Sequence, residues 1–361
     1  MFKKIVVGLG VCSTVLFADV SLEQKIGQML MVGFHGTSAK PNSRICQDIR
    51  RYNLGGVILF DFNPVDRSKP KNIATKNQLA GLTKQLQACG KNGKLLIAVD
   101  QEGGRVQRLK NKYGFYGKFP KASDVVKMDQ SQIKKTYTKM SRELKIAGIN
   151  YNLAPVVDLD INSKNHVIHG LGRSFGKDPE AVATYASMFI DAMHRNGVLT
   201  SLKHFPGHGS SVGDTHKGFV DVTHLWTKAE LEPYRLLKDK ADTVMVAHVF
   251  NKNIDAIYPA TLSAKTVDGL LRKKLGFKGV VITDDLQMGA ISQKYNLKSV
   301  LQLAINAGDD ILLFGNQLDP KKTVSSKELV DTIKALVKEG KVSRKRIGIA
   351  YERIQHLKER L

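Results

Sequence analysis

Short apolar runs rich in β-branched residues recur along this chain, and stretches long enough for a helix separate them. The runs are almost continuously hydrophobic, which is typical of strands buried on both faces of a parallel sheet. We expect strands at Met29–Phe34, Gly56–Phe60, Leu95–Asp100, Tyr151–Ala154, Thr200–His204, Thr243–His248, Val280–Asp284 and Ile311–Phe314.

Amphipathic segments between these runs predict helices, at Ile73–Ala88, Ser131–Ile146, Glu180–Asn196 and Leu297–Ala307. Eight alternations of strand and helix favour a single α/β domain folded as a (β/α)8 TIM-type barrel, for which about 250 residues is typical. The 361 residues leave room for a leader, loop insertions and extra C-terminal helices within 327–361. We allow for irregularity at the first strands. No linker-like tract and no internal repeat divides residues 19–361.

Residues 1–18 have the pattern of a signal peptide. Lys3 and Lys4 precede an apolar run, Ile5–Phe17, and the small residue Ala18 follows it. A membrane-spanning helix needs about 20 apolar residues, so this run is marginal for that role. We therefore expect a periplasmic or secreted protein without stable membrane insertion after leader removal. If the segment is instead a buried first helix or strand, the protein is cytoplasmic.

Two cysteines, Cys46 and Cys89, remain once the leader with Cys12 is removed. An oxidising compartment would allow them to pair. Nothing in the sequence demands a disulfide, however, and we expect two reduced, buried thiols.

The chain is strongly basic, with 56 Lys plus Arg against 33 Asp plus Glu, a formal net charge of +23. Such an excess favours anionic partners such as phospholipid, nucleic acid or acidic wall polymers. We favour the other interpretation, a general preference for lysine without a partner, because the lysines are scattered. No basic run alternates with aromatic residues, so we expect no nucleic-acid partner.

Polar residues stand at the ends of successive predicted strands. In a (β/α)8 barrel the carboxyl ends of the strands face the active site. The polar clusters are therefore expected to converge on one mouth of the barrel, and they are Asp100-Gln101-Glu102, Asp158, Lys203-His204, His248 and Asp284-Asp285.

A Gly-rich segment, KHFPGHGSSVGDTHKG, carries three histidines and an aspartate. Asp214 and His216 are two residues apart, so in an extended chain they project to the same side. The carboxylate could then orient the imidazole, which could transfer a proton near neutral pH. Metal binding and a polar loop without a role are the alternatives. The segment lacks the HExxH and CxxC patterns, and the Lys203 ammonium lies beside His204, so we expect no metal and no cofactor.

Asp284 ends an apolar strand in VVITDDLQMGAI, a position that suits a nucleophile or a metal ligand. The alternative for one member of the Asp284–Asp285 pair is to cap the following helix.

The segment DQEGGRVQRL offers both acceptors and donors. Asp100 can accept hydrogen bonds from two adjacent sugar hydroxyls, and Arg108 supplies fixed donors. We expect Glu102 and Arg105 to form a structural ion pair below the barrel mouth. Arg173, in GLGRSFGKDP, either reaches the pocket or caps a loop.

Together these motifs resemble the β-N-acetylhexosaminidases of glycoside hydrolase family 3. The resemblance rests on KHFPGHG with a following DTH, on DQEGGRVQR, on RSFG and on TDDLQM, and it covers about residues 22–315. It implies a retaining exo-β-N-acetylglucosaminidase that releases terminal N-acetylglucosamine from peptidoglycan fragments through a covalent glycosyl-enzyme. The partners implied are N-acetylglucosamine-containing glycans or muropeptides, and we expect a monomer.

The resemblance also implies roles for individual residues. Asp284 matches the catalytic nucleophile, and His216 matches the general acid/base with Asp214 as its partner. His208 is expected to shape the loop rather than to touch the sugar. The terminal N-acetylglucosamine would be held by Asp100, Arg108, Arg173, Lys203 and His204.

Several alternatives stay open. A neutral imidazole repels anions less than a carboxylate does, so phosphate could replace water as the acceptor in a phosphorylase. A β-glucosidase of the same family, a metal-dependent barrel hydrolase and a basic wall-binding protein without activity are the others. The segment SSVGDTH departs from many relatives after HG but keeps the spacing to the Asp–His pair.

Overall fold

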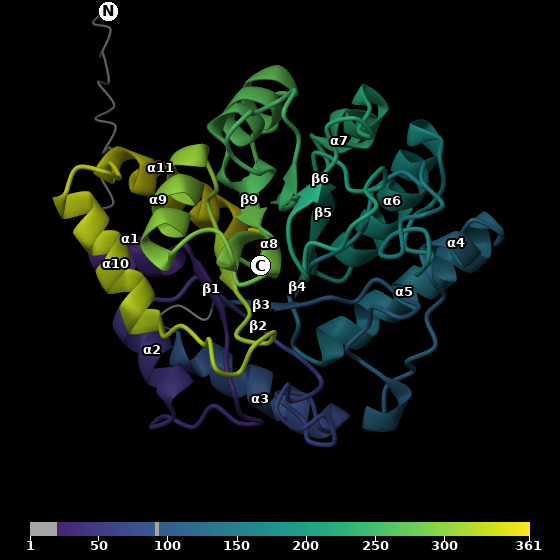
Figure 1. The fold of residues 1–361 in the computed structure, drawn as a ribbon. Helices are drawn as coiled ribbons and strands as arrows, with labels where there is room; N and C mark the ends of the chain where they lie inside the picture. Colours follow the sequence, from purple (N-terminus) through teal and green to yellow (C-terminus); the bar gives the residue numbers. More distant parts are fainter. Residues whose placement is uncertain (1–19, 91–93) are drawn as a thin grey trace, which may run out of the picture.

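A computed structural model describes residues 20–90 and 94–361 of the chain. Eight parallel strands form one sheet in the order β10-β1-β2-β3-β4-β5-β7-β9 (Figure 1). A parallel bridge between Ile282 and Ile311 joins the two ends of this order. The predicted (β/α)8 barrel is therefore confirmed, with the strands β1 (Leu30–Gly33), β2 (Gly56–Ile58), β3 (Leu96–Val99), β4 (Tyr151–Asn152), β5 (Leu199–Phe205), β7 (Thr243–Val246), β9 (Val280–Thr283) and β10 (Leu312–Phe314).

The expected irregularity at the first strands is wrong. β1 pairs with β2 in an unbroken parallel register from Met31–Gly56 to Gly33–Ile58. The register shift lies instead between β5 and β7, at Leu202 and Phe205. It therefore falls on the strand that carries Lys203 and His204.

Helices surround the barrel, and polar caps fix where many of them begin. Thr75 and Asp129 each form a capping box with the Gln three residues later, and Asp178 caps a helix that starts with Pro179. The helices are α1 (Leu22–Gln28), α2 (Arg44–Tyr52), α3 (Lys76–Cys89), α4 (Ala122–Val125), α5 (Gln130–Ile146), α6 (Pro179–His194), α7 (Glu232–Leu237), α8 (Gly289–Ser292), α9 (Leu297–Ala307), α10 (Ser326–Lys338) and α11 (Arg344–Lys358).

Some elements were not predicted. Two short parallel strands, β6 (Val220–Asp221) and β8 (Val249–Phe250), pair outside the barrel and join the loop after β5 to the segment after β7. A π-helix, η4 (Lys265–Lys274), precedes β9. Short 3-10 turns complete the chain at η1 (Asn111–Tyr113), η2 (Lys228–Leu231) and η3 (Ala260–Leu262).

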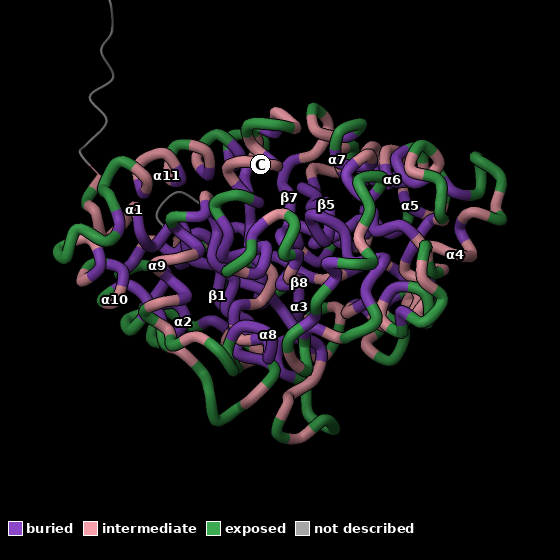
Figure 2. The backbone as a smooth tube through the Cα atoms, turned by 45° about the horizontal axis from the view of Figure 1, so that its top comes forward, coloured by how far each residue is buried: buried purple, intermediate pink, exposed green. Residues whose placement is uncertain are grey.

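The core lies between the strands and the inward faces of the helices, where the buried chain in Figure 2 is concentrated. All eight barrel strands are buried along their length. This burial on both faces accounts for the nearly continuous hydrophobic runs of the sequence.

Cys46 and Cys89 form a disulfide between α2 and α3, with their Cα atoms 5.2 Å apart. The expectation of two reduced thiols is therefore wrong. Both residues are buried, as expected, but the packing of α2 against α3 brings their side chains together. The predicted signal peptide, with Cys12, lies outside the described residues.

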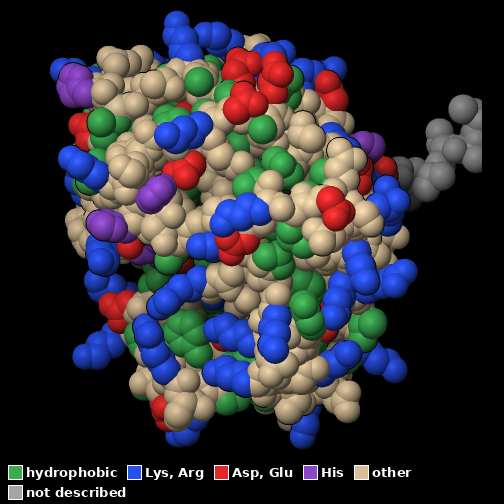
Figure 3. Space-filling view, turned by 90° about the vertical axis from the view of Figure 1, so that its right-hand side faces the viewer, with side chains coloured by type: hydrophobic (Ala, Val, Ile, Leu, Met, Phe, Trp, Pro, Cys, Tyr) green, Lys and Arg blue, Asp and Glu red, His purple; other side chains and the backbone are tan. Residues whose placement is uncertain are grey.

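Lys and Arg side chains are spread over the face shown in Figure 3, with Asp and Glu side chains among them. This distribution matches the scattered lysines of the sequence. Within the described residues, no helix combines the length and the apolar content that a membrane crossing requires.

Candidate active site

The carboxyl ends of the barrel strands bring the predicted residues to one mouth. Asp100 directly follows β3, Lys203 and His204 lie within β5, and Asp284 directly follows β9. Asp158 follows β4 on an extended segment that pairs with β5 through a bridge between Val156 and Lys203. The parallel sheet therefore gathers polar groups that lie far apart in the sequence.

Lys203 is the centre of a buried ion cluster. Its Nζ lies 3.0 Å from Asp100 Oδ1 and 2.7 Å from Glu102 Oε1. Arg108 donates to the other Asp100 oxygen at 3.1 Å. Arg173 donates to both oxygens of Glu102 at 2.8 Å, a bidentate pair. Asp100 thus links Arg108 to Lys203, and Glu102 links Lys203 to Arg173.

The cluster keeps its members charged. Burial by itself would raise the pKa of Glu102, but Arg173 and Lys203 outweigh it and lower the pKa to about 2. Burial likewise opposes ionisation of Asp100, yet Lys203 and Arg108 hold its pKa below the usual range. The cluster therefore presents fixed acceptors and donors suited to sugar hydroxyls.

Two expectations about this region change. The expected ion pair between Glu102 and Arg105 is wrong, because Arg105 is exposed and Glu102 pairs with Arg173 and Lys203. Of the two alternatives for Arg173, the structure supports the first: its guanidinium lies in the cluster, and its side chain is 10% exposed.

His204 is oriented by two partners. Its Nδ1 lies 2.7 Å from Asp158 Oδ2, and its Nε2 lies 3.4 Å from an Arg173 nitrogen. A guanidinium can only donate, so Nε2 accepts and Nδ1 carries the hydrogen given to Asp158. Asp158, only 1% exposed, thereby fixes the ring, and the Arg173 contact joins His204 to the ion cluster.

Asp284 sits at the end of β9 with its Oδ1 accepting from the Asp285 backbone N–H at 2.8 Å. Burial would raise the pKa of its carboxyl, but His248, His204 and His216 outweigh burial and hold the pKa below the usual range. An ionised carboxylate in a largely desolvated site is what a nucleophile requires.

Asp285 has a different role from its neighbour. Its Oδ1 accepts from the backbone N–H groups of Gln287 and Gly315, at 3.1 Å each. Burial raises its pKa to about 6. It fixes the turn between β9 and α8 rather than capping α8, whose start has no side-chain cap.

The Asp214–His216 pair forms as expected, but by a different route. Asp214 Oδ1 accepts from the His216 backbone N–H at 3.0 Å and lies 2.8 Å from His216 Nδ1. The two residues therefore meet across a tight turn and not along an extended strand. Asp214 can still stabilise an imidazolium at His216, whose side chain is 52% exposed.

This turn docks on α8, the helix that follows Asp284. Gly289 N–H donates to the His216 carbonyl at 3.2 Å, and Ala290 N–H donates to the Thr215 carbonyl at 3.1 Å. Both donors belong to α8, which begins five residues after Asp284. The loop from β5 and the end of β9 thus face one region of the mouth.

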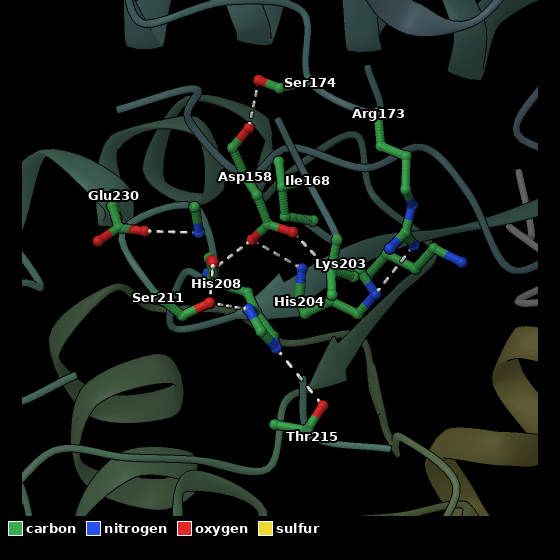
Figure 4. A network of polar contacts seen from close by, with 12 residues as sticks. Asp158, Ile168, Arg173, Ser174, Lys203, His204, His208, Ser211, Thr215 and Glu230 are labelled. Carbon is green, nitrogen blue, oxygen red and sulfur yellow. Dashed lines mark hydrogen bonds and ion pairs between the residues drawn. The ribbon is translucent and has the colours of Figure 1, made fainter. Parts of the chain in front are cut away.

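A second buried network supports the loop from below (Figure 4). It includes Asp158, His208, Ser211, Thr215 and Glu230. Glu230 is 1% exposed, and its Oε2 accepts from the N–H groups of Gly209 and Ser210. The sequence offered no signal for Glu230, because it lies in KAELEPYRLL, which resembles an ordinary surface helix.

Among the described residues, no group of three or more His, Cys, Asp and Glu side chains is arranged to hold a metal ion. The imidazole rings of the three histidines in the Gly-rich segment have separate partners: His204 contacts Asp158, His208 contacts Ser211, and His216 contacts Asp214.

Comparison with known proteins identifies the family. Residues 21–357 match the model of the glycosyl hydrolase family 3 N terminal domain. Beta-hexosaminidase A from Pseudoalteromonas piscicida is 31% identical over 97% of this chain and 63% of its own length. The chain thus spans less than two thirds of this curated relative.

Solved structures agree with this assignment. A family 3 beta-N-acetylglucosaminidase from Paenibacillus sp. str. FPU-7 superposes with a TM-score of 0.83 and 34% identity, covering 94% of this chain and 62% of that one. Beta-N-acetylhexosaminidase from Beutenbergia cavernae gives a TM-score of 0.83 and 32% identity, covering 95% of this chain and 99% of that one. The predicted resemblance is confirmed, and the chain belongs to glycosyl hydrolase family 3.

Proposed function

We propose that the protein is a retaining exo-β-N-acetylglucosaminidase that releases terminal N-acetylglucosamine from peptidoglycan fragments. The observation that carries the proposal is the docking of the Asp214–His216 turn on α8, beside Asp284. It brings a proton donor and an ionised carboxylate to the same part of the mouth. The named relatives, a beta-hexosaminidase and a beta-N-acetylglucosaminidase, support the sugar.

In the first step, the Asp284 carboxylate attacks the anomeric carbon and forms an ester bond to the sugar. The bond between that carbon and the leaving oxygen breaks, and His216 gives its proton to the oxygen. Asp214 stabilises the imidazolium before this transfer. In the second step, His216 accepts a proton from water, the hydroxyl adds to the anomeric carbon, and the Asp284 carboxylate leaves.

The ion cluster would hold the terminal sugar. Asp100 offers carboxylate oxygens to hydroxyls, and Arg108, Arg173 and Lys203 offer N–H donors. His204, fixed by Asp158, completes the set of predicted sugar-binding residues. These groups are already ordered by one another, so little reorganisation is needed when the sugar binds.

We also propose that the protein is exported and acts as a monomer on wall-derived fragments. The Cys46–Cys89 disulfide supports an oxidising compartment. The net charge of +23 suits fragments that carry peptide carboxylates. Fractionation of cells and N-terminal sequencing of the mature protein test the export.

The test of the activity compares the chromogenic β-glycosides of N-acetylglucosamine and glucose. We expect turnover of the N-acetyl sugar, with a loss of at least about 10³-fold in Asp284→Ala because the covalent step loses its nucleophile. Wild-type rates in Asp284→Ala would overturn the assignment of the nucleophile. Preference for the glucoside, or loss of activity in excess EDTA, would favour a β-glucosidase or a metal-dependent hydrolase.

A digest of muropeptides identifies the natural reaction. Mass spectrometry should detect free N-acetylglucosamine, both with and without added phosphate. N-acetylglucosamine 1-phosphate as the main product in phosphate buffer would instead indicate a phosphorylase.

A further inference from the structure

His208 belongs to the same loop as His216 but is buried, with 3% of its surface exposed. Its ring contacts two hydroxyl groups: Nδ1 lies 2.7 Å from Ser211 Oγ, and Nε2 lies 3.4 Å from Thr215 Oγ1 (Figure 4). Thr215 stands between Asp214 and His216 in the sequence. His208 is therefore joined by a side-chain contact to the centre of the Asp214–His216 turn.

The hydrogen bonds of Ser211 favour one tautomer of His208. Ser211 Oγ donates its one hydrogen to the His208 carbonyl at 3.0 Å, and Asn165 Nδ2 donates to Ser211 Oγ at 3.2 Å. The hydroxyl of Ser211 is thus an acceptor toward Nδ1, which carries the ring hydrogen. Nε2 is then left as an acceptor for the Thr215 hydroxyl.

Burial and the neighbouring charges favour a neutral His208 ring. Burial lowers the pKa of His208 to about 4, and His204 acts in the same direction against the opposing effect of Asp158. Near pH 7 the imidazole is therefore uncharged and keeps its accepting nitrogen.

The backbone at His208 is held from two sides. The His208 N–H donates to Asp158 Oδ1 at 2.8 Å, and Glu230 accepts from Gly209 and Ser210 at 3.1 and 3.3 Å. Asp158 and Glu230 are each 1% exposed. The ring of His208 is thus attached to a rigid part of the barrel mouth.

Thr215 connects this rigid part to the exposed pair. Its side chain is 3% exposed, whereas the residues on both sides of it have accessible side chains. Its carbonyl accepts from Ala290 on α8. Thr215 therefore anchors the turn to His208 through its side chain and to α8 through its backbone.

We propose that His208 is a positioning residue for the reaction: by accepting the Thr215 hydroxyl, it fixes the Asp214–His216 turn where the imidazole can protonate the leaving oxygen. This inference rests on the proposed function, in which His216 is the acid/base. His208 itself touches neither the sugar nor the reacting atoms.

Thr215→Val tests the contact because it keeps the shape of the buried side chain and removes only the hydroxyl. Rates are measured on two β-N-acetylglucosaminides, one with a poor leaving group (4-methoxyphenyl) and one with an activated leaving group (2,4-dinitrophenyl). We expect kcat for the poor leaving group to fall about tenfold, the effect of one lost hydrogen bond on a barrier. For the substrate with the activated leaving group, which needs little protonation, we expect kcat to change less than twofold.

Three further variants sharpen the test. Thr215→Ser keeps the hydroxyl and should restore at least half of the wild-type rate. Thr223→Val removes another buried threonine hydroxyl, which accepts from Lys252 N–H, and should leave both rates unchanged. In a His208→Asn background, Thr215→Val should cause no additional loss, because the accepting nitrogen is already gone.

His216→Ala separates this inference from the proposed function. If that variant loses activity equally with both leaving groups, the acid role fails and the inference fails with it. If His216→Ala shows the leaving-group dependence and folded Thr215→Val does not, the proposed function stands and the role of His208 is overturned.

Discussion

Glu102 is the residue on which two cations of the buried ion cluster, Arg173 and Lys203, converge. It receives two hydrogen bonds from Arg173 and lies 2.7 Å from Lys203, and its side chain is only 8% exposed. Its removal would leave these cations with fewer partners in a site that water hardly reaches. Such uncompensated buried charge is costly.

Glu102→Gln should therefore lower the free energy of unfolding by about 3 kcal/mol at pH 7, the cost typical of breaking a buried ion pair. The pKa of Glu102 is lowered from its usual value of 4.5 to about 2, so the ionised form stabilises the fold above pH 4.5. This contribution is lost as the pH falls from 4.5 to 2. The difference in the free energy of unfolding between Glu102→Gln and the wild type should therefore shrink in this range. Urea unfolding across this range measures it.

Arg105→Ala is the matched control at this scale. Arg105 is exposed, so its removal should change stability by less than about 0.5 kcal/mol. A larger loss in Arg105→Ala than in Glu102→Gln would favour the pairing expected from the sequence over the one observed. Sequence proximity suggested Arg105, whereas Arg173 reaches Glu102 only because the barrel brings their loops together.

At the scale of elements, the loop after β5 depends on η2, which carries Glu230. The carboxylate accepts from two loop N–H groups, and no described residue pairs with its other oxygen. Burial raises the pKa of Glu230 to about 7, and the negative charge of Asp158 adds to this effect. Burial raises the pKa of Tyr234, and the negative charges of Asp158 and Glu230 add to this effect.

A raised carboxyl pKa means that the folded protein holds this proton more tightly than the unfolded chain does. Between pH 4.5 and 7 the unfolded chain loses the proton first, so stability falls as the pH rises through this window. The Glu230→Gln variant has no ionisable group at this position. Its free energy of unfolding minus that of the wild type should therefore increase by up to about 3 kcal/mol from pH 4 to above pH 7. Thermal unfolding at pH 4, 5.5 and 7.5 tests this.

Glu352→Gln provides the comparison for Glu230, since Glu352 is exposed on α11. Its stability should follow the wild type at all three pH values. Identical pH profiles for Glu230→Gln and the wild type would contradict the assigned environment of Glu230.

The barrel strands could be predicted because burial on both faces leaves a continuous apolar run in the sequence. Two predicted strands extend one residue too far, to Asp100 and Asp284, which follow the last paired residues of β3 and β9. The strands β6 and β8 could not be predicted, because two residues are too few to produce a period. The Asp214–His216 contact was expected from strand geometry, yet a turn produces it.

At the scale of the whole molecule, the disulfide joins α2 and α3, the helices that follow β1 and β2. It joins Cys46 on α2 to Cys89 on α3 across a sequence separation of 43 residues. The pairing could not be read from the sequence, because it depends on how two helices pack. A cross-link of this length is expected to stabilise the fold by about 4 kcal/mol through the unfolded chain.

The double variant Cys46→Ala with Cys89→Ala should therefore unfold at lower denaturant concentration, with aryl glycosidase rates close to those of the wild type. The wild type treated with a reductant should move to the same midpoint, and the variant should not respond to the reductant. Equal midpoints for the oxidised wild type and the variant would mean that the disulfide adds no stability.

The barrel is closed by its two ends, since β10 pairs with β1 and α11 packs against α1. Within this contact the buried Lys358 donates to Gln28 at 2.8 Å. The first strand thus lacks one neighbour until β10 has been synthesised. Closure of the barrel must therefore wait for its last strand, in whatever order the other strands fold.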